Sequence, residues 1–273
     1  AHKNHVDPRF IDNPGKGCVI GSDHAQRLSR AFVCHHHWHG DSWSRLRFSH
    51  KIRLPIRLQI MISGPIHRFK ERLAHASWRW LELHGSIGPD TGKGRRFGAF
   101  GQNSIICFPQ TTIFNEQYIH IGSNTMIGSH VALSAGMIPG QQCLTNPVVR
   151  IGDRCLIGRG SGIVGHLAID IGHDVWTGHH VYITDQNHGY ERVDLPISMQ
   201  TQPEKPVVVG DGSWIGAGSV ILPGAHIGKH VAIGANSVVN GIIPDFSVAV
   251  GSPAKVIKRY SEQSGWMPAD EFK

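Results

Sequence analysis

The chain has 273 residues, of which 40% are hydrophobic and 17% charged, and its formal net charge is +7. That balance is typical of a globular protein and excludes a chain that is disordered throughout. The sequence contains no uninterrupted run of about 18 apolar residues, so it predicts no membrane-spanning helix.

The positive charge gathers at the start of the chain. Residues 1–80 carry 14 Lys and Arg against 5 Asp and Glu, whereas the remaining residues carry 13 against 15. We expect residues 1–62, which are basic and rich in His, to form an arm outside the main domain. This arm could lie in solvent or make peripheral contact with an anionic membrane surface. The run Cys34–His39 has no partner cluster at zinc-like spacing, so no metal site is predicted. Nucleic-acid binding would rest on the basic arm alone, so no nucleic-acid partner is predicted.

Residues 63–86 are predicted to form an amphipathic helix, with Pro65 at its start and Gly85 near its end. Apolar residues recur there at spacings of three and four, as on one face of a helix. They are Pro65, Ile66, Phe69, Leu73, Ala76, Trp80 and Leu83.

A six-residue repeat occupies the rest of the predicted domain, residues 87–250. Its first coils, residues 87–120, are irregular, with Ile87, Phe97, Ile105 and Ile113 as stacking candidates. From residue 121 an aliphatic residue followed by Gly recurs every six positions, as at Ile121-Gly122. Neither the helix period nor the strand period gives this pattern, and a short fixed period indicates a stacked repeat.

The repeat has a second regular position: a small or branched residue follows each aliphatic residue by four positions. We expect the aliphatic side chains to point inward and stack from coil to coil, with the small residues at the corners. Glycine is expected to provide the backbone freedom that the corner needs. The pattern predicts an all-β parallel β-helix with three short faces.

Two segments leave the rhythm. Residues 184–206 interrupt it and contain three prolines, which predicts a loop extruded from the column. Residues 251–273 follow the last repeat and are expected to form a short C-terminal cap. No leader segment is visible, and the five cysteines are odd in number and scattered, so we expect reduced thiols and a cytoplasmic protein.

An ordered set of motifs in the second half of the chain resembles the hexapeptide-repeat O-acetyltransferases of the maltose, galactoside, nodulation and polysaccharide-decorating types. Its segments are Asp185–Tyr190, Lys205–Val207, Gly210–Ala217, Pro223–Gly228, Ile233–Val239, Ile243–Asp245 and Gly251–Ile257. The resemblance implies a left-handed coil, which the repeat alone does not, and a homotrimer with active sites between subunits.

The resemblance also implies transfer of an acyl group, acetyl by default, from acetyl-CoA to a sugar or glycan hydroxyl, with His188 as general base. A neutral imidazole near pH 7 can take the proton of the attacking hydroxyl. Asp185, Glu191 or a backbone carbonyl could orient the ring. Asn187 and Tyr190, beside the base, are candidates for acceptor binding.

Coenzyme A would bind elsewhere in the repeat. The resemblance implies that Trp214 lines the pantetheine path, that the Ala217 amide stabilises the oxyanion and that the Ala235 amide contacts pantetheine. Two lysines would face the adenosine phosphates, Lys255 and Lys258. The sequence departs from the pattern at Gly241, where relatives carry a phosphate-binding Lys, and at Gly158, where sugar-specific relatives carry Asn.

Three alternatives stay open at this stage. An amine of an amino sugar or other small molecule could replace the hydroxyl as acceptor. A noncatalytic β-helix scaffold would need neither His188 nor the lysine tail. A γ-class carbonic anhydrase would use zinc-binding histidines five residues apart, but His173 and His179 lie six apart, so no metal is expected.

Overall fold

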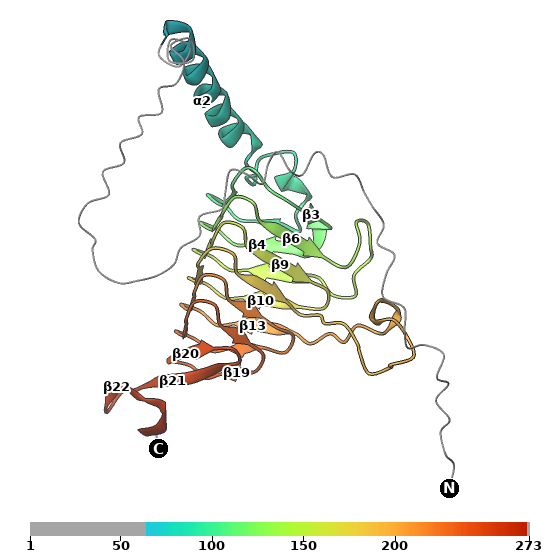
Figure 1. The fold of residues 1–273 in the computed structure, drawn as a ribbon, viewed down its shortest axis with the longest axis vertical. Coiled ribbons are helices and arrows are strands. Elements are labelled where there is room, and N and C mark those ends of the chain that lie inside the picture. Colours follow the sequence, from blue (N-terminus) through green and yellow to red (C-terminus); the bar gives the residue numbers. More distant parts are fainter. Residues whose placement is uncertain (1–63, 272–273) are drawn as a thin grey trace, which may run out of the picture. The chain divides into compact units, whose positions relative to one another are not determined.

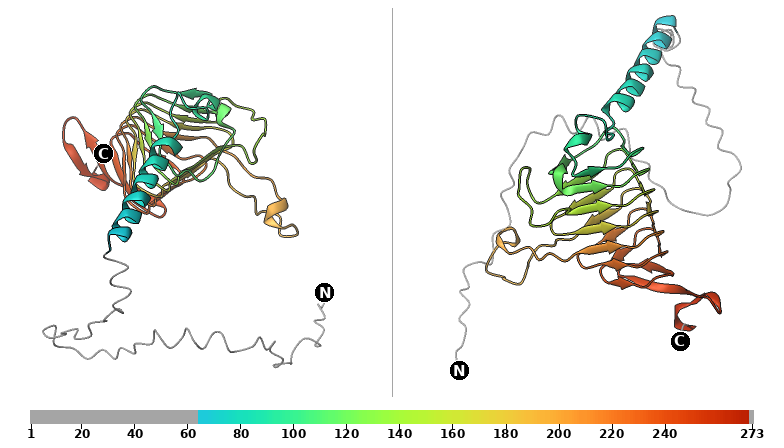
Figure 2. Two further views of the ribbon diagram at one scale, coloured as in Figure 1. Left: turned by 90° about the horizontal axis from the view of Figure 1, so that it is seen from above. Right: turned by 180° about the vertical axis from the view of Figure 1, so that it is seen from behind.

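The computed structural model describes residues 64–271. The expected arm, residues 1–62, and the run Cys34–His39 lie outside the described residues. Helix α2 (Pro65–Gly85) comes first and is followed by a column of short strands (Figures 1 and 2). Among the described residues, no helix has the length and apolar character needed to cross a bilayer.

The column has three sheets that the chain visits in turn, once per coil (Figure 1). The first sheet consists of β1 (Ala99–Phe100), β4 (Ile119–Ile121), β7 (Val149–Ile151), β10 (Ile169–Ile171), β13 (Val207–Val209), β16 (His226–Ile227) and β19 (Ile242–Ile243). The second consists of β2 (Ile105–Ile106), β5 (Met126–Ile127), β8 (Leu156–Ile157), β11 (Trp176–Thr177), β14 (Trp214–Ile215), β17 (Ala232–Ile233), β20 (Ser247–Gly251), β21 (Ala254–Ser261) and β22 (Gly265–Pro268). The third consists of β3 (Ile113–Phe114), β6 (Ala132–Ala135), β9 (Gly162–Gly165), β12 (Tyr182–Thr184), β15 (Val220–Ile221) and β18 (Val238–Val239).

We call the bend from the first sheet to the second the first corner, the bend from the second to the third the second corner, and the return to the first sheet the third corner. Short 3-10 turns lie at η1 (Gly94–Arg96), η2 (Glu116–Tyr118), η3 (Ile197–Met199) and η4 (Ala269–Glu271).

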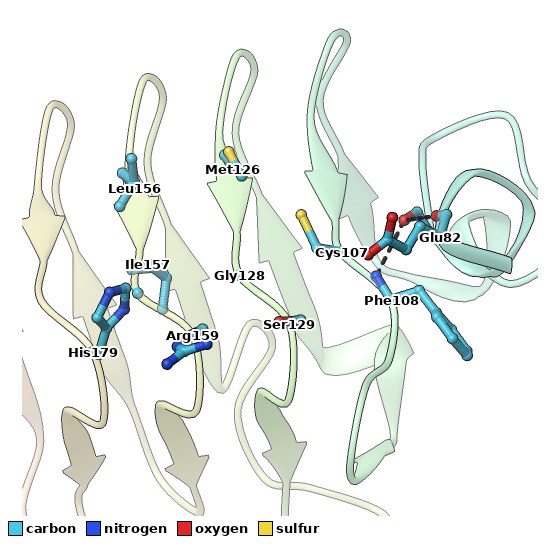
Figure 3. A pocket seen from close by; sticks show the side chains of 12 residues that line it. Glu82, Cys107, Phe108, Met126, Gly128, Ser129, Leu156, Ile157, Arg159 and His179 are labelled. Atoms are coloured by element: carbon cyan, nitrogen blue, oxygen red, sulfur yellow. Dashed lines mark hydrogen bonds between the residues drawn. The ribbon is translucent and has the colours of Figure 1, made fainter. Parts of the chain in front are cut away.

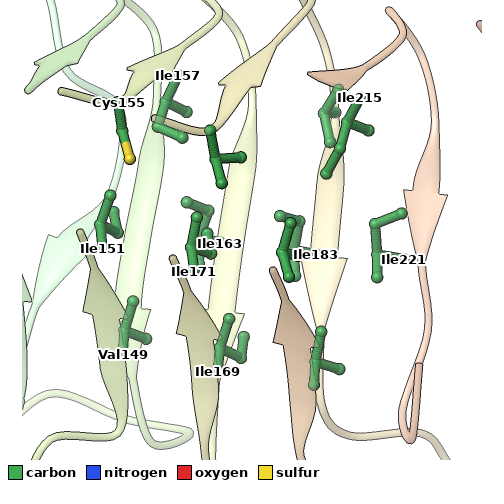
Figure 4. Packing of buried hydrophobic residues seen from close by; sticks show 14 of the residues in the cluster. Val149, Ile151, Cys155, Ile157, Ile163, Ile169, Ile171, Ile183, Ile215 and Ile221 are labelled. Carbon is green, nitrogen blue, oxygen red and sulfur yellow. The ribbon is translucent and has the colours of Figure 1, made fainter. Parts of the chain in front are cut away.

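The predicted stacking of aliphatic residues is confirmed, as Figure 4 shows for the middle coils. Ile151, Ile171 and Val209 stand in register on neighbouring strands of the first sheet, and each is at most 1% exposed. The small residues at the second regular position are buried too, such as Cys155 and Ser219. The prediction for Ile105 was wrong. It is 39% exposed because its neighbour Ile106 takes the inward place.

The glycine that follows the aliphatic residue has a different role from the expected one. The left-handed backbone is adopted two positions later, for example by Asn124 rather than Gly122. At Gly152 a Cβ atom would lie 2.5 Å from the carbonyl oxygen of Gly172 on the next coil. Glycine is therefore required by the close approach of neighbouring coils.

The end of the column differs from a simple cap. β20 pairs with β17 in parallel and with β21 in antiparallel fashion, and β22 extends the same sheet. The predicted cap at 251–273 thus consists, within the described residues, of an antiparallel extension of the second sheet and the turn η4.

Candidate active site

Two insertions leave the column at the third corner. The longer runs from Asp185 to Pro206, between β12 and β13, and agrees in position with the predicted loop at 184–206. The other runs from Gly136 to Pro147, between β6 and β7, and sequence reasoning did not find it. Asn115 holds its root, since its Nδ2 donates to the carbonyls of Ala135 and Ile138.

Asp185 anchors the longer loop. Its side chain is completely buried, and its two carboxylate oxygens accept the amides of His166, Leu167 and Ala168 at 2.7–2.8 Å. These amides belong to the third corner of the preceding coil. The carboxylate, expected as an orienting group for His188, is therefore used to fasten the start of the loop to the column.

His188 lies on one arm of a hairpin-like stem. The amide of Asn187 donates to the Pro203 carbonyl and that of Gly189 to the Thr201 carbonyl, so backbone bonds flank the histidine on both sides. The His188 Nδ1 atom lies 3.5 Å from Nε2 of Gln202, whose other amide atom contacts the side chain of Gln186. Sequence reasoning missed Gln202, because nothing in its spacing marks it as a neighbour of His188.

The orientation of the Gln186 and Gln202 side-chain amides decides which nitrogen of the His188 imidazole is unprotonated. The oxygen and nitrogen of a Gln side chain are assigned from their partners. If both glutamines turn over, Nδ1–H of His188 donates a hydrogen bond to the Gln202 oxygen, and Nε2 is left as the unprotonated nitrogen that can act as a base. The geometry is thus compatible with a base held by an amide.

The other candidates on the loop lie near the base without touching its ring. Glu191 Oε2 accepts the amide of Tyr190 at 3.0 Å, and Asn187 Oδ1 accepts the amide of His188 at 2.9 Å. Tyr190 is 71% exposed. Glu191 therefore shapes the turn after His188 and remains only a candidate for a direct role.

The coenzyme candidates occupy another part of the column. Trp214 stands on the outer face of the second sheet, 48% exposed, in one row with Trp176, Ala232 and Val248. Lys258 continues that row on β21 opposite Val248, and Lys255 lies opposite Val250. The structure therefore brings Trp214 and both lysines to one face of one sheet.

The second corner carries a row of backbone amides without partners. Within residues 64–271, none of the five amides that follow the corner glycine donates a hydrogen bond to the protein. They belong to Ser129, Arg159, His179, Ala217 and Ala235. At the first corner, by contrast, four of the equivalent amides are paired with side chains of the next coil: Ser123 with Asp153, Asp153 with His173, His173 with Asp211, and Lys229 with Asp245.

This contrast gives the second corner a distinct chemistry. A backbone N–H at the surface needs water or a ligand as acceptor. Ala217 and Ala235 are exposed and have the smallest side chains of the row, so a ligand can approach their amides closely. The two residues predicted to contact coenzyme A are therefore neighbours in one row of free donors.

A cavity of about 460 Å³ covers the other end of this row (Figure 3). Arg159 and His179 border it from neighbouring coils, and Cys107 and Glu82 border it near α2. Burial, together with the nearby Glu82 carboxylate, raises the pKa of the Cys107 thiol, which stays protonated. Gly178, which precedes the cavity-lining His179, lies close to the amide of Ala217 on the next coil, so the cavity adjoins the coenzyme candidates.

The histidines of the carbonic anhydrase alternative do not converge. Nδ1 of His173 lies 3.1 Å from Asp153 at the first corner, whereas His179 borders the cavity at the second. In the described part of the chain, no group of three or more metal-binding side chains could hold an ion.

The stacked six-residue repeat and its three sheets define a hexapeptide-repeat protein, and comparison with known proteins agrees. Residues 206–241 match the family model for bacterial transferase hexapeptide (six repeats), and residues 148–184 match that for the hexapeptide repeat of succinyl-transferase. The chain is 34% identical over 167 residues to WbbJ of Escherichia coli K12, a protein named for O-acetyl transfer in lipopolysaccharide biosynthesis; the match covers 59% of this chain and 81% of WbbJ.

The chain therefore belongs to the hexapeptide-repeat acetyltransferase family, whose β-helix is left-handed. A Mycobacterium tuberculosis protein named as an acetyltransferase is 35% identical over 150 residues, which cover 55% of this chain and 44% of that protein. Among solved structures, a mutant of AntD, an N-acyltransferase from Bacillus cereus, shares the fold. It has a TM-score of 0.54 and 22% identity, over 65% of this chain and 92% of that one.

Proposed function

We propose that this protein transfers an acyl group, acetyl by default, from coenzyme A to a hydroxyl of a sugar or glycan, with His188 as general base. The observation that carries the proposal is the row of free amides at the second corner, beside the exposed Trp214. Its sequence relatives include WbbJ and a galactoside O-acetyltransferase from Lactococcus lactis, to which it is 35% identical over 94 residues.

Each group then has a defined part in the reaction. The acceptor oxygen attacks the thioester carbonyl while Nε2 of His188 takes its proton. The amide of Ala217 donates to the oxyanion that forms. The carbon–sulfur bond then breaks, the imidazolium returns its proton to the leaving coenzyme A thiolate, and the acylated acceptor departs. No covalent enzyme intermediate is required.

The two ends of the free-amide row suit different substrates. Trp214, Ala217 and Ala235 lead toward Lys255 and Lys258, so we place the pantetheine arm and the phosphates along this line. The cavity at Arg159 and His179 adjoins the same row on its far side. We place the acceptor there, where the guanidinium and imidazole can donate hydrogen bonds to a glycan.

We further propose that the site is completed between subunits of a homotrimer. In one chain His188 leaves from the third corner, whereas Ala217 lies at the second. The outer rows of two sheets are apolar, with Met126, Leu156, Trp176 and Trp214 on the second and Ala132, Tyr182, Val220 and Val238 on the third. The outer row of the first sheet is more polar, since it carries His120, Arg150, Asp170 and His226 beside Val208 and Ile242.

The test is release of thiol from acetyl-CoA with a panel of mono- and oligosaccharide acceptors, an amino sugar among them. His188→Ala should lower the rate by about two to four orders of magnitude, because the hydroxyl loses its base. His226→Ala, an exposed histidine on the outer face of the first sheet, is the matched control and should keep the wild-type rate.

Each other outcome has a clear meaning. Equal rates for wild type and His188→Ala would remove the proposed base. Transfer confined to the amino sugar would replace the hydroxyl by an amine as acceptor. A protein that binds no coenzyme A would be a scaffold.

A further inference from the structure

Helix α2 carries an apolar stripe that the column does not cover. No residue of the helix is buried. Five large apolar side chains of the stripe are between 56% and 77% exposed, namely Ile66, Phe69, Leu73, Trp80 and Leu83. A contiguous apolar surface of this kind, left uncovered by the column, marks an interaction site.

The helix contacts the column with its other side. The rings of Trp78 and Phe108 lie 6.2 Å apart, and Glu82 borders the cavity next to Phe108. Successive residues of a helix are about 100° apart, so Trp78 and Glu82 lie about 160° around the axis from Trp80. The stripe therefore faces away from the first coils, and packing of the column cannot be its purpose.

Positive charge borders the stripe on both edges. Arg68, Arg72 and Arg79 follow one edge, and Lys70 follows the other. The two acidic residues lie on the side of the column, where Glu71 pairs with His67 at 3.1 Å and Glu82 accepts from Trp78 at 2.8 Å. The exposed face thus combines aromatic and aliphatic residues with flanking cations and lacks carboxylates.

This charge pattern discriminates between occupants of the stripe. In a parallel bundle of identical helices, the residues flanking the apolar seam face each other across the interface. Neither border of the stripe carries Asp or Glu, so Lys70, Arg72 and Arg79 would have no acidic partner across such a seam. An anionic lipid surface instead offers both an apolar layer for the stripe and negative head groups for its borders.

We propose that α2 binds in the plane of an anionic membrane surface, with the apolar stripe inserted at the level of the head groups. The inference does not depend on acyl transfer, since it rests on α2 alone. It has a consequence for the cavity, which Glu82 and Ser86 of the same helix end and linker help to form. Membrane binding would hold that cavity close to acceptors attached to lipids.

The test is co-sedimentation of the full chain with vesicles. Binding is expected to phosphatidylcholine vesicles containing phosphatidylglycerol and to be much weaker with phosphatidylcholine alone. Trp80→Ala should weaken binding by about tenfold or more, because an apolar anchor is lost. Trp78→Ala is the matched control, since the same residue type is removed from the column side, and it should bind within about twofold of wild type.

A second pair of measurements addresses charge and folding. Each Arg→Gln change at Arg68, Arg72 or Arg79 should weaken binding to the anionic vesicles by about fivefold, and added salt should have the same direction of effect. An unchanged thermal unfolding temperature for the Trp80→Ala protein would show that its weaker vesicle binding is not a folding defect.

Absence of binding to anionic vesicles would overturn the proposal. So would equal losses for both tryptophans, or a lower oligomer mass in Trp80→Ala by light scattering, which would assign the stripe to another copy of the chain.

Discussion

Single glycines set the spacing of the coils. At Gly152 the neighbouring backbone leaves no room for a Cβ atom, whereas at Gly241 no other atom lies within 4 Å of its place. Glycine is therefore required for steric reasons at position 152 but not at position 241. The sequence pattern marks the first kind by its six-residue period.

Gly152→Ala should lower the free energy of unfolding by about 1–3 kcal/mol, because the rigid backbone of the next coil must move. Gly241→Ala should leave it unchanged or raise it by up to about 1 kcal/mol, since alanine restricts the unfolded chain. Urea denaturation of both variants measures the difference. Equal effects at the two sites would show that close packing of coils is not what selects glycine.

The buried Asp185 makes a similar residue-scale prediction. Asp185→Asn keeps the shape but removes the charge that three backbone amides share, and should lower the free energy of unfolding by about 2–3 kcal/mol. Limited proteolysis should then cut the loop at 185–206 faster. Asp194→Asn, whose partner Arg192 is equally exposed on the same loop, should change stability by less than about 0.5 kcal/mol. A stable Asp185→Asn protein with an intact loop would contradict the anchoring role.

At the scale of elements, the periodic parts of the fold could be predicted and the insertions only in part. The loop at 184–206 was found because it shifts the phase of the repeat. The insertion at 136–147 was missed because Ile121 and Ile151, paired on neighbouring coils, are thirty residues apart, while Val209 and Ile227 are eighteen apart. The extra length is two full repeats and leaves the phase unchanged.

The candidate site, too, could be predicted from the sequence only in part. Family motifs singled out His188, Trp214, Ala217 and Ala235, because each stands at a fixed place in a repeat. They could not supply the neighbours that folding brings together. Gln202 meets His188 across the loop stem, and the free amides of the second corner become visible only by comparison with the paired amides of the first.

At the scale of the whole molecule, the proposed site has two halves, which stand at different corners of one chain. The apolar outer faces of the second and third sheets offer the surfaces on which a neighbouring chain can bring these halves together. In the proposed trimer, we expect the loop at 185–206 to reach the second corner of the next subunit.

Subunit complementation tests this central claim most directly. His188→Ala removes the base, and Ala217→Tyr blocks the coenzyme corner, so each variant alone should be inactive in thiol release from acetyl-CoA. When the two are unfolded together and refolded as mixed trimers, activity should return to about a quarter of the wild-type value, because sites that combine two intact halves form by chance. No recovery in mixed trimers of confirmed mass, with both parents folded, would contradict a site shared between subunits.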